Sequence, residues 1–170
     1  MLDVLYERTG VEANSFGKYR LIAGLGRGGM ATVHLAVMHG PAGFNKLAVL
    51  KQIHPEYADD PEILGMFLDE AQLAARLSHP NVVQTNEVGQ EGERRFLAME
   101  YLDGQPLSRI NRRLERHGGL PLVLHLRVMA DLLSGLHYAH ELTDYDGSPL
   151  GVVHRDVTPQ NIFVTYEGAV

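Results

Sequence analysis

The sequence has no cysteine among its 170 residues. Disulfide bonds and thiolate metal sites are therefore excluded, and the composition fits a reducing compartment. Basic residues are not in excess either, since 15 Lys and Arg stand against 21 Asp and Glu for a net charge of −6. A chain of negative charge gives no reason to expect nucleic acid as a partner.

A long uninterrupted apolar run is also missing. The most apolar region, residues 120–142, is interrupted by His125, Arg127, Asp131, His137 and His140. That argues against a membrane-spanning segment. The first fourteen residues lack the basic start and apolar core of a signal peptide. We therefore expect a cytoplasmic location, with no membrane segment in this chain.

The first half of the sequence contains short segments with the residue alternation of β-strands. Five such segments are separated by turns rich in glycine and proline: Tyr19–Ala23, Thr32–Met38, Leu47–Ile53, Val82–Val88 and Arg94–Tyr101. A helix is predicted to begin near Asp60, because Asp is a good N-cap and the following proline suits the first helical position. We predict a five-stranded antiparallel sheet with one helix over residues 19–101, after a loose lead-in over residues 1–18.

The second half is more helical. After a linker at Asp103–Pro106, the predicted elements are a basic helix over Leu107–Arg116, a long and mostly buried helix over Leu120–Leu142, and short strands at Val152-Val153 and Ile162–Tyr166. The predicted fold class is α+β, with a small sheet lobe followed by a helical lobe over residues 102–170. A cleft between two such lobes is a natural place for a ligand.

A glycine-rich segment joins the first two predicted strands. Glycines let main-chain N–H groups approach phosphate oxygens closely. Two registers of a GxGxxG pattern are possible, and one of them uses Gly24, Gly26 and Gly29. The other uses Gly26, Gly28 and Ala31, and it is preferred because Val33 then stands where an adenine ring needs an apolar cover. A plain hairpin turn is the simpler interpretation of this segment, whereas a Rossmann motif is excluded because a strand follows instead of a helix.

Lys51 and Glu70 form a candidate ion pair. Alternation along the third predicted strand places Lys51 on the same face as Val49. Helical spacing places Glu70 on or beside the apolar stripe that contains Phe67 and Ala74. A carboxylate next to a core needs a partner, and Lys51 is the obvious one. The simpler alternatives are that Lys51 is a solvated residue of its strand and that Glu70 only flanks the apolar face of its helix.

His154-Arg155-Asp156, with Asn161 five residues after the Asp, is the most specific pattern in the chain. Asp156 can accept a proton from a hydroxyl group, and Asn161 offers a neutral oxygen ligand that suits Mg²⁺. Such a pattern after a long apolar helix is hard to explain as a structural accident.

Taken in order, these motifs resemble the eukaryotic-like serine/threonine protein kinase family over residues 19–170. The Gly-Met sequence of the glycine-rich segment is typical of the bacterial branch of that family. The resemblance implies ATP-dependent transfer of a γ-phosphoryl group to a Ser or Thr hydroxyl of a protein, with ATP and Mg²⁺ as cofactors. Asp156 corresponds to the catalytic base, Lys51 to the phosphate-contacting lysine, and Asn161 to a catalytic and metal-binding residue. The nucleotide-contacting positions that it implies are Leu25, Gly26, Arg27, Gly28, Gly29, Met30, Ala31, Thr32, Val33, Val49, Lys51, Glu70, Met99 as gatekeeper, Glu100 and Leu102 in the hinge, and Phe163.

Three substitutions depart from the family pattern. Ala31 replaces the third glycine of the loop, and Val49 replaces a smaller alanine. Thr158 stands where serine/threonine kinases usually carry a lysine aimed at the γ-phosphate, so slower transfer is expected. Pro159 weakly favours serine/threonine over tyrosine as the acceptor.

The sequence contains no Asp-Phe-Gly, the family's second metal-binding motif. We therefore expect the N-terminal part of such a domain, truncated before that motif, with weak or absent transfer by this chain alone. The strand Ile162–Tyr166 is expected to lack its hairpin partner, and the long helix to expose an apolar patch that a protein partner would cover. The alternatives are a non-catalytic nucleotide-binding or interaction module and, less favoured, a small-molecule phosphotransferase of similar fold.

Overall fold

The structure is a computed structural model that describes residues 15–170, apart from the side chain of His117. Most of the predicted lead-in therefore lies outside the described residues. The chain forms two compact units, and their boundaries interleave. The first contains the chain up to Arg76 together with Gln84–Tyr101, and the second contains Leu77–Val83 together with Leu102–Val170. Each unit is described by itself.

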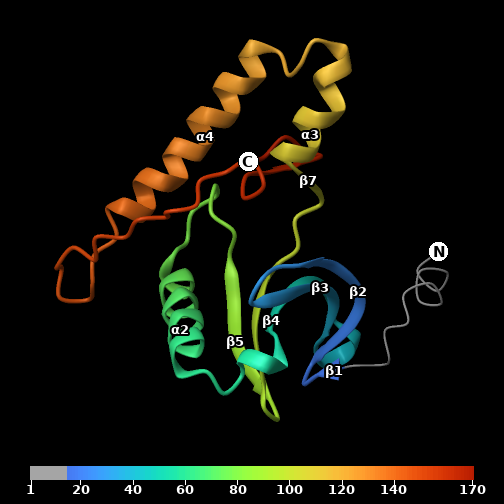
Figure 1. The fold of residues 1–170 in the computed structure, drawn as a ribbon, viewed down its shortest axis with the longest axis vertical. Coiled ribbons are helices and arrows are strands. Elements are labelled where there is room, and N and C mark those ends of the chain that lie inside the picture. The colour runs from blue at the N-terminus through green and yellow to red at the C-terminus, as the bar shows by residue number, and fades with distance from the viewer. Residues whose placement is uncertain (1–14) are drawn as a thin grey trace. The chain divides into compact units, whose positions relative to one another are not determined.

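The first unit is a curved antiparallel sheet with one helix (Figure 1). Its six strands follow the order β1-β2-β3-β4-β6-β5. Their bounds are β1 Ser15–Phe16, β2 Tyr19–Arg27, β3 Ala31–His39, β4 Asn45–Ile53, β5 Thr85–Glu91 and β6 Arg94–Glu100. The five predicted strands are confirmed, and β1 is an addition because Phe16 of the predicted lead-in pairs with Tyr19.

Small and large residues alternate on one face of this sheet. Ala36, Ala48 and Ala98 are almost fully buried. Their small size leaves room for the aromatic rings of Phe16 and Phe96, which meet edge to face at 5.4 Å. This contact brings β1 and β6, which are not neighbours in the sheet, to one core.

The other face of the sheet carries the helix α2, Pro61–Arg76. Phe67 and Ala71 of α2 pack with Ile53 and Leu97 in a second core cluster. The predicted helix start is confirmed, because Asp60 Oδ1 accepts hydrogen bonds from the main-chain N–H groups of residues 62 and 63 at 3.0 and 3.2 Å. Short 3₁₀ turns at Pro41–Gly43 and Pro55–Tyr57 complete the connections of this unit.

The second unit has two helices and a small two-stranded sheet. Its elements are β7 Gly104–Pro106, α3 Leu107–Leu114, a 3₁₀ turn at Glu115–His117, α4 Leu122–His140 and β8 Phe163–Thr165. The buried core consists of Leu107, Val128 and Ile162, contributed by α3, by α4 and by the chain just before β8.

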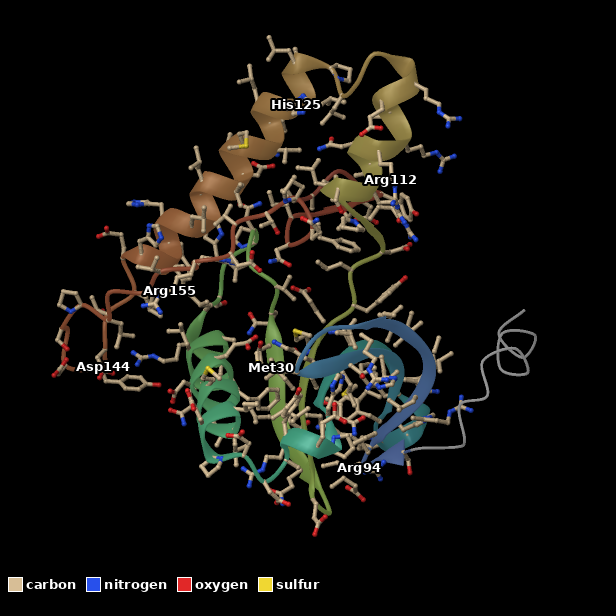
Figure 2. All side chains as sticks on the ribbon, viewed as in Figure 1. Met30, Arg94, Arg112, His125, Asp144 and Arg155 are labelled. Carbon is tan, nitrogen blue, oxygen red and sulfur yellow. The ribbon has the colours of Figure 1, made fainter. Side chains whose placement is uncertain are left out.

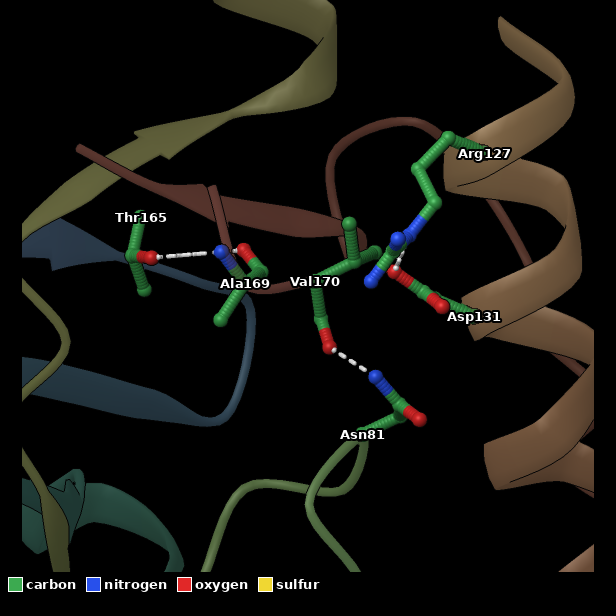
Figure 3. A network of polar contacts seen from close by, with 6 residues as sticks. All are labelled: Asn81, Arg127, Asp131, Thr165, Ala169 and Val170. Carbon is green, nitrogen blue, oxygen red and sulfur yellow. Dashed lines mark hydrogen bonds and ion pairs between the residues drawn. The ribbon is translucent and has the colours of Figure 1, made fainter. Parts of the chain in front are cut away.

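The segment Leu77–Val83 is held within the second unit by polar contacts (Figure 3). Asn81 Nδ2 donates to the main-chain oxygen of Val170 at 2.8 Å, and Thr165 and Ala169 close a turn nearby. The rings of His79 and Tyr138 stack with centroids 5.1 Å apart. Gly135 permits this approach, because a Cβ there would lie only 2.7 Å from the main-chain oxygen of Asn81.

Two predictions for this half are wrong. The predicted linker at Asp103–Pro106 contains β7, which pairs with β8 in the register Gly104↔Thr165. Both helices of this unit lie between the two strands in the sequence, so β7 is not the hairpin partner whose absence was expected. Val152-Val153 is not a strand. The local pattern could not reveal either result, because a strand exists only where a partner is in register.

The helix α4 is less buried than predicted. Of its residues only Val128 and Gly135 are buried. The apolar side chains of Leu122, Val123, Leu124, Leu126, Met129 and Leu133 are exposed. The predicted apolar patch is therefore present on this helix. No helix in residues 15–170 is long and apolar enough to cross a membrane.

Candidate active site

The glycine-rich segment is the tip of the β2–β3 hairpin, where Figure 2 labels Met30. Gly26 pairs with Val33, and Gly28 N donates to Ala31 O at 2.8 Å to close the turn. None of the glycines from Gly24 to Gly29 has a positive φ. The backbone therefore does not need glycine here for its conformation.

The glycines leave open space beside the main chain of this hairpin. A Cβ built at Gly24, Gly26 or Gly29 would meet no heavy atom within 4 Å, and one at Gly28 would lie 3.5 Å from Ala31 O. These three open positions leave the main chain accessible to a ligand. A surface of this kind suits phosphate oxygens, which need close main-chain approach.

His54 braces this hairpin, a role that its place in the sequence did not predict. Its main-chain N donates to Met30 O at 3.0 Å, and its Nε2 lies 3.0 Å from Thr32 Oγ1. The side chain is buried, with its ring stacked against Tyr57. Because Thr32 and His54 are 22 residues apart, no local pattern signals the contact. The only sequence signal for this role is that His54 directly follows the strand that contains Lys51.

Lys51 and Glu70 form the predicted ion pair. Lys51 Nζ lies 2.6 Å from Oε1 and 2.9 Å from Oε2 of Glu70. The pairing follows from the two periodicities, since Lys51 shares the α2-facing side of β4 with Ile53, and Glu70 lies one turn beyond the buried Phe67. The Lys51 side chain is 29% exposed and that of Glu70 is 54% exposed. Glu70 is thus beside the apolar stripe and open to solvent.

The predicted adenine-side residues occupy neighbouring strands. Val49 pairs with Met99 across β4 and β6, and Met99 packs against the α2-side core. Glu100 is used structurally, since its carboxylate accepts a 2.7 Å hydrogen bond from Gln84 N and its own N donates to Gln84 O. Leu102 is the first residue after the boundary of the first unit, and it is half-buried.

Asp156 and Asn161 meet in the second unit. Asn161 Nδ2 donates to Asp156 Oδ2 at 2.7 Å and to Asp156 O at 3.0 Å. Arg155, labelled in Figure 2, has a φ of 63°, an unusual value for a residue other than glycine. This conformation turns the chain directly before Asp156. Strained backbone of this kind clusters at functional sites.

The loop that contains Asp156 and Asn161 is anchored to α3. Leu107 N donates to Ile162 O at 2.8 Å, and Ser108 N donates to Pro159 O at 2.9 Å. These N–H groups belong to the first turn of α3, which has no partners of its own for them. Phe163 follows in β8, where it is half-buried opposite Pro106. The helix thereby fixes the two ends of the segment around Asn161.

The structure thus assembles two pairs from the predicted residues, Lys51 with Glu70 in the first unit and Asp156 with Asn161 in the second. The first pair fixes an ammonium group on a sheet. The second fixes a carboxylate beside an amide whose carbonyl oxygen keeps its capacity to bind a cation. In chemical terms, one unit holds an ammonium group on a sheet whose glycine-rich hairpin has an open main chain, and the other holds a carboxylate that is able to accept a proton.

Comparison with known proteins agrees with these features. A model of the protein kinase domain matches residues 19–170. The tyrosine-protein kinase MasK of Myxococcus xanthus is 44% identical over 158 residues, which cover 91% of this chain and 24% of that protein. The serine/threonine-protein kinase PksC of Streptomyces coelicolor is 33% identical, with 91% of this chain and 27% of PksC covered. This chain therefore spans about a quarter of the length of these relatives.

Solved structures give the same result for the fold. A crystal structure of the PknI kinase domain of Mycobacterium tuberculosis matches with a TM-score of 0.70 and 28% sequence identity, covering 92% of this chain and 58% of that domain. The predicted α+β kinase-like fold, with a sheet lobe and an incomplete helical lobe, is confirmed. The chain belongs to the protein kinase domain family.

Proposed function

We propose that this chain carries the nucleotide-binding and catalytic-loop parts of an ATP-dependent kinase that phosphorylates Ser or Thr hydroxyls of proteins. The observation that carries the proposal is the presence of both polar pairs, Lys51 with Glu70 and Asp156 with Asn161. Either pair alone has ordinary structural explanations. Both pairs, in a chain of this family, serve phosphoryl transfer.

The first unit supplies the binding residues for ATP. The open main chain of Gly24–Gly29 suits phosphate oxygens, and the apolar side chains of Val33 and Val49 suit the adenine ring. Lys51 would contact the phosphates. Its bond to Glu70 holds the ammonium group in one position, so less side-chain freedom is lost when the nucleotide binds.

The second unit supplies the proton acceptor. Asp156 would take the proton from the substrate hydroxyl, and Asn161 orients its carboxylate through the 2.7 Å hydrogen bond. The side-chain nitrogen of Asn161 donates both of its hydrogen bonds to Asp156, and neither bond uses Oδ1. Its Oδ1 therefore fits as one ligand for Mg²⁺, which prefers oxygen. When bound, Mg²⁺ offsets the negative charge of the phosphate groups.

The acceptor residue is the finer part of the proposal. Pro159 weakly favours Ser and Thr as acceptors, and the relative PksC is named a serine/threonine-protein kinase. MasK is named a tyrosine-protein kinase at 44% identity, so tyrosine is a second candidate acceptor. Thr158 brings no positive charge to the loop, and we expect transfer by this chain to be slow for that reason.

Two measurements on the 170-residue chain test the proposal. The first is binding of a fluorescent ATP analogue with and without Mg²⁺, for the wild type and for Lys51→Met. The second is transfer of labelled phosphate from ATP to a generic basic protein, for the wild type and for Asp156→Asn, followed by identification of the phosphorylated amino acid.

We expect Mg²⁺-dependent binding that Lys51→Met weakens, and phosphoserine or phosphothreonine that Asp156→Asn abolishes. Binding without any transfer would favour the non-catalytic module. Phosphorylation of aminoglycoside- or choline-type acceptors in place of proteins would favour the small-molecule phosphotransferase. Phosphotyrosine alone would move the specificity to the second candidate.

A further inference from the structure

One face of α3 and of the turn that follows it carries four arginines. Arg109, Arg112, Arg113 and Arg116 are spaced three, four and seven residues from the first. On a helix this spacing brings all four side chains to one side. We call this set the α3 arginine face, and Figure 2 labels Arg112 within it.

The positive charge of this face is not neutralised by the described part of the chain. All four arginine side chains are exposed. Arg109 Nη1 donates to the neutral Oε1 of Gln105 at 2.9 Å, and within residues 15–170 no carboxylate pairs with any of the four. Even Glu115, three residues after Arg112, makes no ion pair with them.

The opposite side of α3 fixes the direction in which this face points. Leu107 is buried with Val128 and Ile162, and Ile110 and Leu114 are half-buried. The helix therefore cannot turn its arginines inward without exposing apolar area. The arginines are therefore carried on a backbone that is already ordered, so no ordering of the main chain is needed on binding.

The same helix is bonded to the catalytic-loop segment. Its first-turn N–H groups donate to Pro159 O and Ile162 O, which lie on either side of Asn161. Arg109 is linked further, through Gln105, to the hydroxyl of Tyr166 at 2.9 Å. A ligand held on the arginine face is therefore held by the unit that contains the proton acceptor.

We propose that the α3 arginine face binds an acidic segment of the protein substrate. This inference rests on the proposed function and names the substrate class for the same site. The four arginines extend over about 10 Å of helix at 1.5 Å per residue. An extended peptide of about four residues covers the same length, and every second side chain faces the helix, so two carboxylates can each meet a guanidinium group.

The charge of the whole chain favours a peptide over a nucleic acid. A duplex or a long single strand would run beyond the arginine face and meet a chain of net charge −6. A short acidic peptide segment meets only the arginines. The favoured ligand is therefore an acidic stretch in a protein, with carboxylate side chains.

The test compares two double variants of the 170-residue chain. Arg112→Gln/Arg113→Gln removes two charges from the arginine face. Arg20→Gln/Lys46→Gln removes two charges from exposed positions of the sheet. These positions belong to the first unit and are distant in the sequence from the α3 arginine face. Thermal melts by circular dichroism verify that both variants fold like the wild type. The probe is a fluorescein-labelled peptide with four glutamates, measured by anisotropy at two salt concentrations.

We expect the wild type to bind the glutamate peptide more weakly as salt rises. Arg112→Gln/Arg113→Gln should weaken binding by about five- to tenfold, as expected for two lost exposed ion pairs, while Arg20→Gln/Lys46→Gln should change it less than about twofold. Equal losses in the two variants, absence of salt-dependent binding, or tighter binding of an oligonucleotide with the same number of charges would overturn the inference.

ATP binding, measured on the same samples, separates this inference from the proposed function. We expect it to be unchanged in Arg112→Gln/Arg113→Gln. If the wild type binds no ATP, the proposed kinase function fails, whereas peptide binding that depends on the arginines still supports the acidic docking face. If ATP binds and the peptide does not, the kinase function stands and the docking face is wrong.

Discussion

The side-chain amide of Asn161 donates a 2.7 Å hydrogen bond to Oδ2 of Asp156 and a 3.0 Å hydrogen bond to the main-chain oxygen of the same residue. Both side chains are exposed, so packing does little to orient the carboxylate. The amide of Asn161 is what fixes it.

Replacing Asn161 should therefore disable the proton acceptor without unfolding the chain. We expect Asn161→Ala to lower phosphoryl transfer by about 10²-fold or more, because a general base contributes on the order of 10² to 10⁴. Gln160→Ala is the matched control, since Gln160 is an exposed neighbour. The measurement is transfer from labelled ATP, and an equal effect of the two substitutions would contradict the assigned role.

The Lys51–Glu70 pair should matter for nucleotide binding more than for stability. Its side chains are 29% and 54% exposed, and ion pairs so exposed contribute about 0–1 kcal/mol to folding. We expect Glu70→Gln to weaken binding of Mg²⁺-ATP by about five- to tenfold, while the free energy of unfolding changes by less than about 1 kcal/mol.

A double-mutant cycle checks that Glu70 acts through Lys51. In the background of Lys51→Met, Glu70→Gln should have no further effect on ATP binding, because its partner is already gone. Independent, additive losses would show that the two residues act separately.

His54 should set the order of the glycine-rich hairpin. His54→Phe keeps a ring at this buried position and removes the side-chain hydrogen bond to Thr32. We expect a loss of about 1–2 kcal/mol in unfolding free energy, the usual cost of a broken buried hydrogen bond. Hydrogen exchange of the amides at residues 26–31 should become faster. Thr32→Val supplies the matched change on the other side of the bond, and exchange unaffected by either substitution would refute the bracing role.

Glu87 should make stability fall in acid. Burial alone would raise the pKa of Glu87, but hydrogen bonds from Lys18 and Tyr19 outweigh it and hold the pKa below its ordinary value of 4.5. A carboxyl group whose pKa is lowered by folding stabilises the fold above the unfolded pKa. That contribution is lost as the pH falls through the folded pKa.

Urea unfolding between about pH 6 and about pH 3 measures this effect. We expect Glu87→Gln to be less stable than the wild type at the upper end of that range and to show a smaller loss toward the lower end. Tyr19→Phe retains the buried ring and removes its 2.8 Å hydrogen bond to Glu87, so part of the same acid sensitivity should disappear. A pH profile identical in all three proteins would contradict the linkage.

Two helical glycines should respond to alanine in opposite directions. Alanine favours a helix over glycine by about 1 kcal/mol. In α2, a Cβ at Gly65 meets no heavy atom within 4 Å, so Gly65→Ala should stabilise the chain by about that amount. In α4, a Cβ at Gly135 would lie 2.7 Å from the main-chain oxygen of Asn81, so Gly135→Ala should destabilise it. Thermal melts of the two variants test this prediction. A higher melting temperature in both variants would contradict it, because Asn81 would then be shown to move aside for the added Cβ at little cost.

Much of the first unit was predictable because its signals are local. Alternating strands, the Asp60 cap and the periodicities that bring Lys51 to Glu70 all lie in short stretches of sequence. The helix α4 was misjudged because an apolar composition indicates a need for burial and does not show how much of that surface the chain covers.

The sequence by itself determined the family, the strands of the sheet, the start of α2 and the chemical identity of the two polar pairs, because each depends on residue type and short-range spacing. Only the tertiary structure decided that β7 pairs with β8, that His54 braces the glycine-rich hairpin and that α3 is bonded to the ends of the Asn161 segment. These contacts join residues 22 to 61 positions apart. Hydrogen bonds over such separations are selected by the packing of the whole fold, and no local pattern encodes them.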